Sequence, residues 1–197
     1  MCILITMEKS RCGWCLGHPL YREYHDREWG VPVYDNETKQ FENLVLESTQ
    51  AGLSWITILK RRENYRRAYE GFDPEKIARW GESDILRLMG DEGIIRNRRK
   101  IVSSINNARR FLEVKEEFGS FSDYYWHFQD GVPIVNHWET LEEVPAKTEL
   151  SERIAKDMKK RGFTFLGPVI TYANMQSLGM VNDHLVSCFR FQELEGK

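Results

Sequence analysis

Several hallmarks of membrane and secreted proteins are missing from this 197-residue chain. The apolar run near its start, residues 2–6, is too short for a signal peptide or a membrane anchor. The chain has just 4 cysteines. Without a secretory leader, so few cysteines favour a reducing compartment, where they act as metal ligands or core residues more often than in disulfides. We therefore expect a cytoplasmic protein with no membrane partner.

Strand signals are equally scarce. No alternation of apolar and polar residues extends beyond a few positions, and the sequence contains no internal repeat. Hydrophobic residues make up 41% of the chain and charged residues 29%, which are ordinary values for a globular protein. A chain of this length can bury about 70% of the surface that its unfolded form exposes. We therefore predict a single all-α domain, which we expect to be a monomer.

Apolar residues recur at helical spacing through most of the chain. Residues 131–145 show no such period and are predicted to form a loop. Ser83, Ser122 and Asn182 are expected to cap helices that follow them, and Thr148 or Ser151 to begin another. The predicted helices span residues 20–28, 39–49, 55–71, 74–80, 83–90, 96–117, 122–128, 148–162 and 168–179, and a short one after residue 182.

Positive charge is not in excess, but it is clustered. The net charge of −2 at pH 7 gives no indication of a nucleic-acid partner. Three basic clusters nevertheless occur, at residues 60–67, 96–100 and 159–161. Gathered on one face they would form a basic surface able to contact a phosphate backbone; scattered, they are solvated helix faces.

Residues 162–167 separate two predicted helices and form a hairpin with Gly162 and Gly167 at its ends. Glycine at both ends lets backbone N–H groups face outward at the start of a helix, which suits a phosphate oxygen. A basic triplet directly precedes the hairpin: Lys159, Lys160 and Arg161. The pattern fits a helix-hairpin-helix clamp on a DNA backbone, and equally an ordinary pair of antiparallel helices.

Cysteine and histidine gather near both ends of the sequence. His184 and Cys188 are four residues apart on a predicted helical turn, so both could face one metal ion. Four more candidate ligands lie near the other end: Cys12, Cys15, His18 and His25. Spacing alone favours Cys12 with Cys15, a C-x-x-C pair, as the partners. Core cysteines and hydrogen-bonded histidines are the alternative.

The stretch 47–55 combines a carboxylate, a glycine turn and a tryptophan. At about 100° per residue, Glu47 lies outside the apolar face of its predicted helix, so we expect it on a cleft wall, neither deep in the core nor freely solvated. Gly52 ends that helix, and Ser54 can cap a second one that begins at Trp55. A helix-turn-helix corner with a surface glutamate and a core tryptophan is the alternative.

Aromatic residues are dense before and within this stretch. A base taken out of a DNA stack needs aromatic faces around it and polar groups on its edge. Glu47 could supply an edge contact. The candidates for the aromatic faces are Trp14, Tyr21, Tyr24, Trp29 and Trp55.

Five segments together are similar to one known family. They are Cys12–Trp14, Tyr24–Pro32, Glu47–Trp55, Lys159–Phe163 and Val181–His184. They resemble the DNA-3-methyladenine glycosylase I family, and the likeness extends from residue 11 to about residue 191. It implies an all-α fold of the helix-hairpin-helix glycosylase type, with a zinc site that joins the N- and C-terminal segments. Residues 1–10 would then be a dispensable extension, 11–191 the glycosylase domain and 192–197 a tail.

The resemblance also implies roles for individual residues. One structural Zn²⁺ ion would be held by Cys12, His25, His184 and Cys188, in place of the choice of Cys15 from spacing. The base pocket would comprise Trp14, Tyr21, Tyr24, Trp29, Glu47 and Trp55. Gly52 and Leu53 would fill the gap left in the duplex, and DNA would also be contacted by Lys159, Lys160, Arg161, Gly162, Phe163 and Gly167.

The activity implied is base excision repair of double-stranded DNA that contains alkylated adenine. The enzyme would flip out 3-methyladenine and hydrolyse its N-glycosidic bond, leaving an abasic site. A bifunctional glycosylase/lyase would need an amine nucleophile, and no lysine lies among the aromatic motifs. A zinc-stabilised DNA-binding module without chemistry is the other alternative. The family is not thought to use an aspartate at the position of Asp183 as a catalytic group, so we assign Asp183 no such role.

Overall fold

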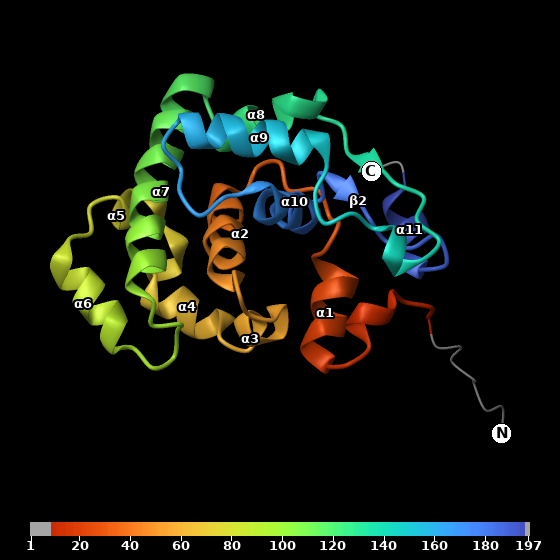
Figure 1. Cartoon of the computed structure of the whole chain (residues 1–197), viewed down its shortest axis with the longest axis horizontal. Helices are drawn as coiled ribbons and strands as arrows, with labels where there is room; N and C mark the ends of the chain where they lie inside the picture. Colours follow the sequence, from red (N-terminus) through yellow and green to blue (C-terminus); the bar gives the residue numbers. More distant parts are fainter. Residues whose placement is uncertain (1–8, 196–197) are drawn as a thin grey trace.

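The computed structural model describes residues 9–195 (Figure 1). This part of the chain is mostly helical, as predicted, and contains no helix long and apolar enough to cross a membrane. Its α-helices are α1 (Pro19–Arg27), α2 (Glu37–Gln50), α3 (Trp55–Leu59), α4 (Arg62–Ala68), α5 (Pro74–Ile77), α6 (Glu82–Gly90), α7 (Arg98–Phe118), α8 (Phe121–Trp126), α9 (Glu149–Lys160), α10 (Pro168–Ser177) and α11 (Phe189–Leu194).

Helix α2 lies at the centre of the molecule, between α7 and α10 (Figure 1). It also contacts α3 and α8. Every residue from position 40 to position 49 is buried, so this helix is covered on all sides, not along a single stripe. Its polar side chains must therefore find partners inside the protein. Asn43, for example, donates a hydrogen bond to the carbonyl of Ser177 in α10.

The longest helix, α7, is fixed at both ends by local sequence. Asn97 caps its start by accepting a hydrogen bond from the backbone N–H of Lys100. Gly119 ends it with a φ of 93°, a conformation that favours glycine. Between these ends the helix packs against α2, α5, α6 and α8.

Helices α9 and α10 pack directly against each other and are joined by the 162–167 hairpin. Thr148 caps α9, and Gly162 has a φ of 88° where the chain leaves that helix. Phe163 and Leu166 turn inward and are buried in the core. The two helices therefore hold the hairpin between them as a rigid corner.

The two ends of the described chain meet. The N–H of Phe189 in α11 donates a hydrogen bond to the carbonyl of Ser10, and Lys9 pairs with Glu193. Residues 9 and 10 thus contact the domain, whereas the rest of the expected extension, residues 1–8, lies outside the described residues. At the other end, α11 extends through the buried Leu194, inside the segment expected to be a tail.

Four local expectations were wrong. The predicted loop 131–145 contains β1 (Ile134–Val135), which pairs in parallel with β2 (Val181–Asn182), and a short 3₁₀ turn (Leu141–Glu143). The long helical period of 55–71 breaks into α3, α4 and a 3₁₀ turn (Glu70–Phe72): the first break falls just before α4, where Arg61 has a φ of −105° and a ψ of −1°, and Gly71 in the 3₁₀ turn has a φ of 73°. Gly81 and Ser120, not Ser83 and Ser122, precede their helices.

The fourth concerns residues 183–188, which form no helix. The side chain of Asn182 does accept the N–H of His184, but the chain continues in an extended segment and a turn. α11 begins only after Cys188.

Candidate active site and metal centre

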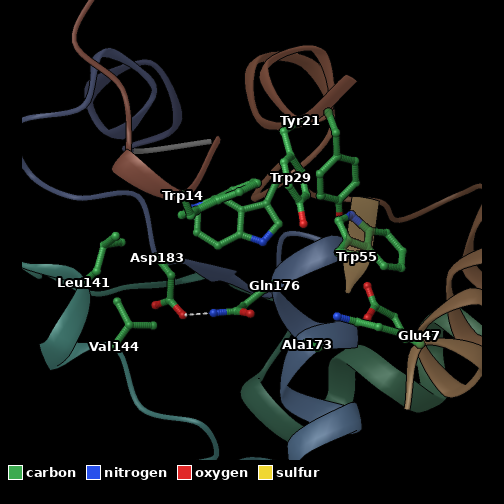
Figure 2. Close-up of a pocket in the computed structure, with 12 residues that line it drawn as sticks. Trp14, Tyr21, Trp29, Glu47, Trp55, Leu141, Val144, Ala173, Gln176 and Asp183 are labelled. Carbon is green, nitrogen blue, oxygen red and sulfur yellow. Dashed lines mark hydrogen bonds between the residues drawn. The ribbon is translucent and has the colours of Figure 1, made fainter. Parts of the chain in front are cut away.

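A cavity of about 400 Å³ opens at the junction of the N-terminal segment with α2, α3 and α10 (Figure 2). This volume is within the range of small-molecule sites. The structure brings together in its wall all six residues expected there: Trp14, Tyr21, Tyr24, Trp29, Glu47 and Trp55. The remaining wall residues are Gln50, Leu141, Val144, Ala173, Gln176 and Asp183.

The aromatic walls hold one another in place. Trp14 packs edge-on against Trp29 at 5.1 Å between ring centroids and against Tyr21 at 5.7 Å. Tyr24 and Trp55 form a second pair at 5.4 Å. Such contacts fix ring orientation as well as burying apolar area, so the cavity is lined by preset aromatic faces.

Two of these aromatics also carry polar groups into the wall. The hydroxyl of Tyr21 accepts a hydrogen bond of 3.0 Å from the backbone N–H of Ile56, which ties α1 to the start of α3. The indole Nε1 of Trp55 is buried without an acceptor among the described residues. A buried N–H without a partner is costly, so a bound ligand that offers an acceptor would be favoured there.

Glu47 projects from α2 toward the cavity (Figure 2). It lies in the cavity wall, as expected, but is only 4% exposed, because α2 is covered on all sides from residue 40 to residue 49. No described residue makes a hydrogen bond to it. Burial raises the pKa of Glu47 to about 8, although the nearby charge of Arg62 lowers it. A cationic ligand would favour the ionised form.

Arg62 belongs to an ion-pair network behind this wall. Its guanidinium donates to both oxygens of Glu28, at 2.7 and 2.8 Å, and to Glu42 at 2.6 Å. Lys39 also pairs with Glu28, and Arg66 with Glu42. These contacts link α1, α2 and α4, so the network holds together the helices that carry Tyr24 and Glu47.

A second constellation lies where the two ends of the chain meet. One potential ligand atom from each of Cys12, His25, His184 and Cys188 lies within 4.8 Å of all the others, and all four residues are buried. His25 Nε2 is 3.2 Å from His184 Nδ1, and Cys188 Sγ is 3.5 Å from His25 Nε2. Zinc–ligand bond lengths in a tetrahedron give about 3.3 Å between two nitrogens and about 3.6 Å between nitrogen and sulfur.

The outer nitrogens of both histidines are already engaged. His25 Nδ1 contacts Asp26 Oδ1 at 2.8 Å, and His184 Nε2 contacts the carbonyl of Trp29 at 3.0 Å. A carboxylate and a carbonyl can only accept, so these nitrogens carry the protons and the inner nitrogens present lone pairs to each other. Two acceptors facing each other beside two thiols fit a metal better than a packed core.

Cys15 is not part of this cluster. Its thiol donates to the carbonyl of Cys12 at 3.1 Å within a short 3₁₀ turn (Gly13–Cys15), and burial raises its pKa to about 11. The choice of Cys15 from C-x-x-C spacing was therefore wrong, and the structure brings together the set implied by the resemblance. Spacing failed because His25 reaches the cluster from α1, which sequence separation does not show.

Comparison with known proteins decides the family. Residues 14–191 match the model of the methyladenine glycosylase family. The chain belongs to this family. It is 50% identical over 179 residues to DNA-3-methyladenine glycosylase 1 of Escherichia coli, covering 91% of this chain and 95% of that protein. It is 47% identical to DNA-3-methyladenine glycosylase of Haemophilus influenzae, covering 91% and 96%.

Solved structures of the family superpose closely on this one. A crystal structure of 3-methyladenine DNA glycosylase I has a TM-score of 0.88 at 49% identity, covering 91% of this chain and 98% of that one. The Staphylococcus aureus enzyme, studied for its recognition of 3-methyladenine, has a TM-score of 0.87 at 37% identity, covering 91% and 95%. The mostly helical fold is thus that of the family.

The two segments that the family resemblance assigns to DNA contact are held by one face of α7. Lys100 Nζ donates hydrogen bonds of 2.7 Å to the carbonyls of Thr49 and Ala51, just before the turn that carries Gly52 and Leu53. Further along α7, Ser103 bonds to the carbonyl and the hydroxyl of Thr164 in the hairpin, and Asn107 donates to that carbonyl and accepts from the Thr164 N–H. Positions 100, 103 and 107 share one helix face.

The tip of the first segment is exposed. Gly52 has a φ of 81° and open space where a Cβ would lie, and the Leu53 side chain is 38% exposed. In the hairpin, the backbone N–H groups of Leu166 and Gly167 have no acceptor among the described residues. Such N–H groups before the start of α10 suit an anionic oxygen.

The side chains expected to contact DNA at the hairpin differ in what they can offer. Lys159 and Lys160 are exposed. Arg161 is paired with Glu117 and Asp157, so two carboxylates offset its charge. Phe163 is 4% exposed and packs in the core, so only its backbone is available.

Sequence reasoning missed half of the cavity wall. Leu141 and Val144 come from the segment expected to be a loop, where no pattern pointed to a site. Asp183 was considered but given no catalytic role. It is buried in the wall and accepts hydrogen bonds from four side chains. The sequence feature that could have pointed to Asp183 is its position next to His184, a candidate metal ligand.

Proposed function

We propose that this protein excises 3-methyladenine from alkylated double-stranded DNA by hydrolysis of the N-glycosidic bond, as its family and its relatives' names indicate. The observation that carries the proposal is the cavity, in which preset aromatic faces surround a buried carboxyl group that makes no hydrogen bond to a described residue. Glycosylases act on a base flipped out of the duplex, and the cavity is the place for it.

The substrate's chemistry explains why these groups suffice. A base alkylated at N3 is cationic in DNA and leaves as a neutral molecule when the bond from the sugar C1′ to the base breaks. Water then adds its oxygen to C1′ and releases a proton. Because the leaving base needs no proton, no strong general acid is required, and much of the catalysis can come from selecting the cation.

Residues of the cavity wall would select the cationic base. Trp14 and Trp55 present electron-rich faces, which favour a cationic ring over a neutral one. Glu47 accepts hydrogen bonds from the adenine edge and, once ionised, complements the charge. Tyr24, whose hydroxyl lies close to Glu47, is the candidate for a further edge contact. Normal adenine lacks the charge and keeps a much stronger glycosidic bond.

DNA is held by the segments that α7 supports. The turn with Gly52 and Leu53 would fill the gap that the flipped base leaves, and the α9–hairpin–α10 unit would act as a helix-hairpin-helix clamp on the backbone. Exposed Lys159 and Lys160 would add charge attraction. Arg161, Gly162, Phe163 and Gly167 would contribute mainly through the position and backbone of the hairpin.

The metal centre would hold one structural Zn²⁺ through Cys12, His25, His184 and Cys188. Four protein ligands complete a tetrahedral site, so the ion would stabilise the junction of the two chain ends and would not activate a nucleophile. The cytoplasmic location and the monomeric state remain expectations.

A glycosylase/lyase is disfavoured by the cavity itself, because none of the described residues that line it is a lysine. The deciding experiment is incubation of methylated duplex DNA with the protein, followed by identification of the released bases by mass spectrometry. Release of 3-methyladenine with intact, abasic strands is expected. Binding without any base release would favour the DNA-binding module, and strand cleavage at abasic sites would favour the lyase.

A further inference from the structure

Asp183 is the centre of a hydrogen-bond network at the cavity wall. It is 1% exposed. Its Oδ1 accepts from Asn136 Nδ2 at 2.7 Å and from Trp138 Nε1 at 2.8 Å. Its Oδ2 accepts from the Tyr172 hydroxyl and from Gln176 Nε2, both at 2.7 Å. None of the four donors carries a formal charge, so hydrogen bonds alone hold this carboxylate.

These partners decide how the Gln176 amide is oriented. The indole N–H of Trp138 can only donate, and the carboxylate can only accept. Gln176 must therefore turn its NH₂ group to Asp183, which sends its oxygen the other way. Figure 2 shows the amide nitrogen facing Asp183 and the amide oxygen facing the cavity. No described residue donates a hydrogen bond to that oxygen.

The backbone of Gln176 is also anchored, since its carbonyl accepts a 2.9 Å hydrogen bond from the N–H of Gly30. Gln176 thus offers a fixed acceptor to whatever base enters the cavity. An adenine edge carries an exocyclic amino group at ring position 6, whereas a guanine edge carries a carbonyl there. A hydrogen-bond acceptor in the wall accepts a hydrogen bond from the adenine amino group and repels the guanine carbonyl.

We propose that Gln176 is a specificity-determining residue, whose amide oxygen accepts a hydrogen bond from the exocyclic amine of the flipped adenine. Asp183 is the positioning residue that fixes this amide as an acceptor. The inference rests on the proposed function and adds to it a basis for choosing between two alkylated purines. 3-Methyladenine and 3-methylguanine are both cations in DNA, so the preference for charge does not separate them.

The test uses duplex DNA alkylated with dimethyl sulfate, from which both bases can be released and quantified in the same reaction. The ratio of the two release rates does not depend on how much of the protein is folded. Gln176→Met removes the acceptor with little change in size. It should lower the ratio of 3-methyladenine to 3-methylguanine release by roughly threefold to tenfold, the effect of one hydrogen bond.

Asp183→Asn provides a sharper test. Trp138 still requires an acceptor, so the amide oxygen introduced at position 183 stays on its side and the new NH₂ group faces Tyr172 and Gln176. The Tyr172 hydroxyl can accept a hydrogen bond from this NH₂ group without moving, whereas Gln176 must rotate its amide to accept one. Its NH₂ group then faces the cavity and favours a carbonyl. The ratio should fall below that of Gln176→Met.

Two controls separate this effect from general damage. Tyr172→Phe removes one donor from Asp183 but leaves the Gln176 amide as it is, and Gln192→Met changes an exposed glutamine on α11. Both should keep the wild-type ratio. An unchanged ratio in Gln176→Met, a ratio in Asp183→Asn no lower than in Gln176→Met, or an equal fall in Tyr172→Phe would overturn the inference. Failure of the wild type to release any alkylated base would instead overturn the proposed function.

Discussion

His25 Nε2 lies 3.2 Å from His184 Nδ1, although 159 residues separate the two in sequence. Their outer nitrogens are bound to Asp26 and to the Trp29 carbonyl, so two lone pairs converge where two cysteine thiols also point. A bound cation removes the repulsion between those lone pairs and cross-links the two ends of the chain. The junction of α1, β2 and α11 should therefore depend on metal.

The first prediction concerns that metal. The purified protein should contain about one zinc ion per chain, measured by inductively coupled plasma mass spectrometry. His25→Ala should lose the ion and unfold at a lower temperature, because it removes one of four ligands. Cys15→Ser should keep both metal and stability, because that thiol only donates to a carbonyl. Metal loss in Cys15→Ser with retention in His25→Ala would restore the C-x-x-C assignment.

The sequence was most informative where local physics decides structure. The period of apolar residues located α2, α7, α9 and α10, and Thr148, one of the two expected starts, caps α9. The prediction of a helix after Asn182 was wrong: the side chain of Asn182 accepts a hydrogen bond from the N–H of His184, but no helix starts there. There the chain is extended because residues 181 and 182 pair with β1, a contact 47 residues away in sequence.

The candidate site depends on such distant contacts. The aromatic residues and Glu47 could be named from motifs, but the burial of Glu47 follows from the packing of α7, α8 and α10 around α2. Gln176 carried no signal of its own, because its role depends on the orientation imposed by Asp183. Chemistry that rests on burial and on hydrogen-bond direction cannot be obtained from spacing.

The second prediction concerns DNA binding. Affinity for undamaged duplex should fall as salt rises, and Lys160→Gln should reduce the slope of log K against log salt by about 0.9, the value for one phosphate contact. Arg161→Gln should change the slope less, because Glu117 and Asp157 already offset that charge. Fluorescence anisotropy over a salt series measures both. An affinity that hardly varies with salt would rule out the clamp.

The third prediction tests whether Lys100 supports the 51–54 turn or contacts a DNA phosphate. Lys100 holds the carbonyls of Thr49 and Ala51, so Lys100→Met should leave the 51–54 turn loose and slow excision from duplex DNA. The salt slope should stay at the wild-type value, because the ammonium group is used inside the protein. Arg99→Met is a neighbouring control for loss of one charge from the same cluster. If Lys100→Met changes only the slope, Lys100 is a phosphate contact.

The fourth prediction concerns pH. Burial raises the pKa of Glu47 to about 8, with Tyr24, Tyr125 and Arg62 nearby. The cation of the substrate needs the ionised carboxylate, so excision at low enzyme concentration should increase as pH rises toward about 8 and then level off. Stability should change in the opposite sense, since the unfolded state gives up this proton near pH 4.5 and the folded state near pH 8.

The contribution of Glu47 to stability is therefore complete below pH 4.5 and is lost as pH rises to about 8. Glu47→Gln does not titrate, so its rate should be flat across this range, and its melting temperature should exceed that of the wild type more at pH 8 than at pH 5. Calorimetry at pH 5 and at pH 8 measures this difference in melting temperature. Parallel pH profiles for the variant and the wild type would show that another group titrates.

The last prediction concerns the chemical role of Glu47. Glu47→Gln keeps the shape of the side chain but removes the charge that complements the cationic base. It should lower single-turnover excision of 3-methyladenine by at least about tenfold, which corresponds to about 1.4 kcal/mol of transition-state stabilisation. Affinity for undamaged DNA should not change, because the buried carboxyl lies in the cavity and away from the hairpin.

Glu92→Gln, a change at a side chain that is 87% exposed, serves as the matched control and should excise at the wild-type rate. Release at the wild-type rate by Glu47→Gln would remove Glu47 from the mechanism. In the same reactions, DNA strands should stay intact until heat or alkali is applied, because the cavity wall among described residues holds no lysine to form a covalent intermediate with the sugar. Strand breaks that appear together with the released base would show that such a nucleophile exists outside this wall.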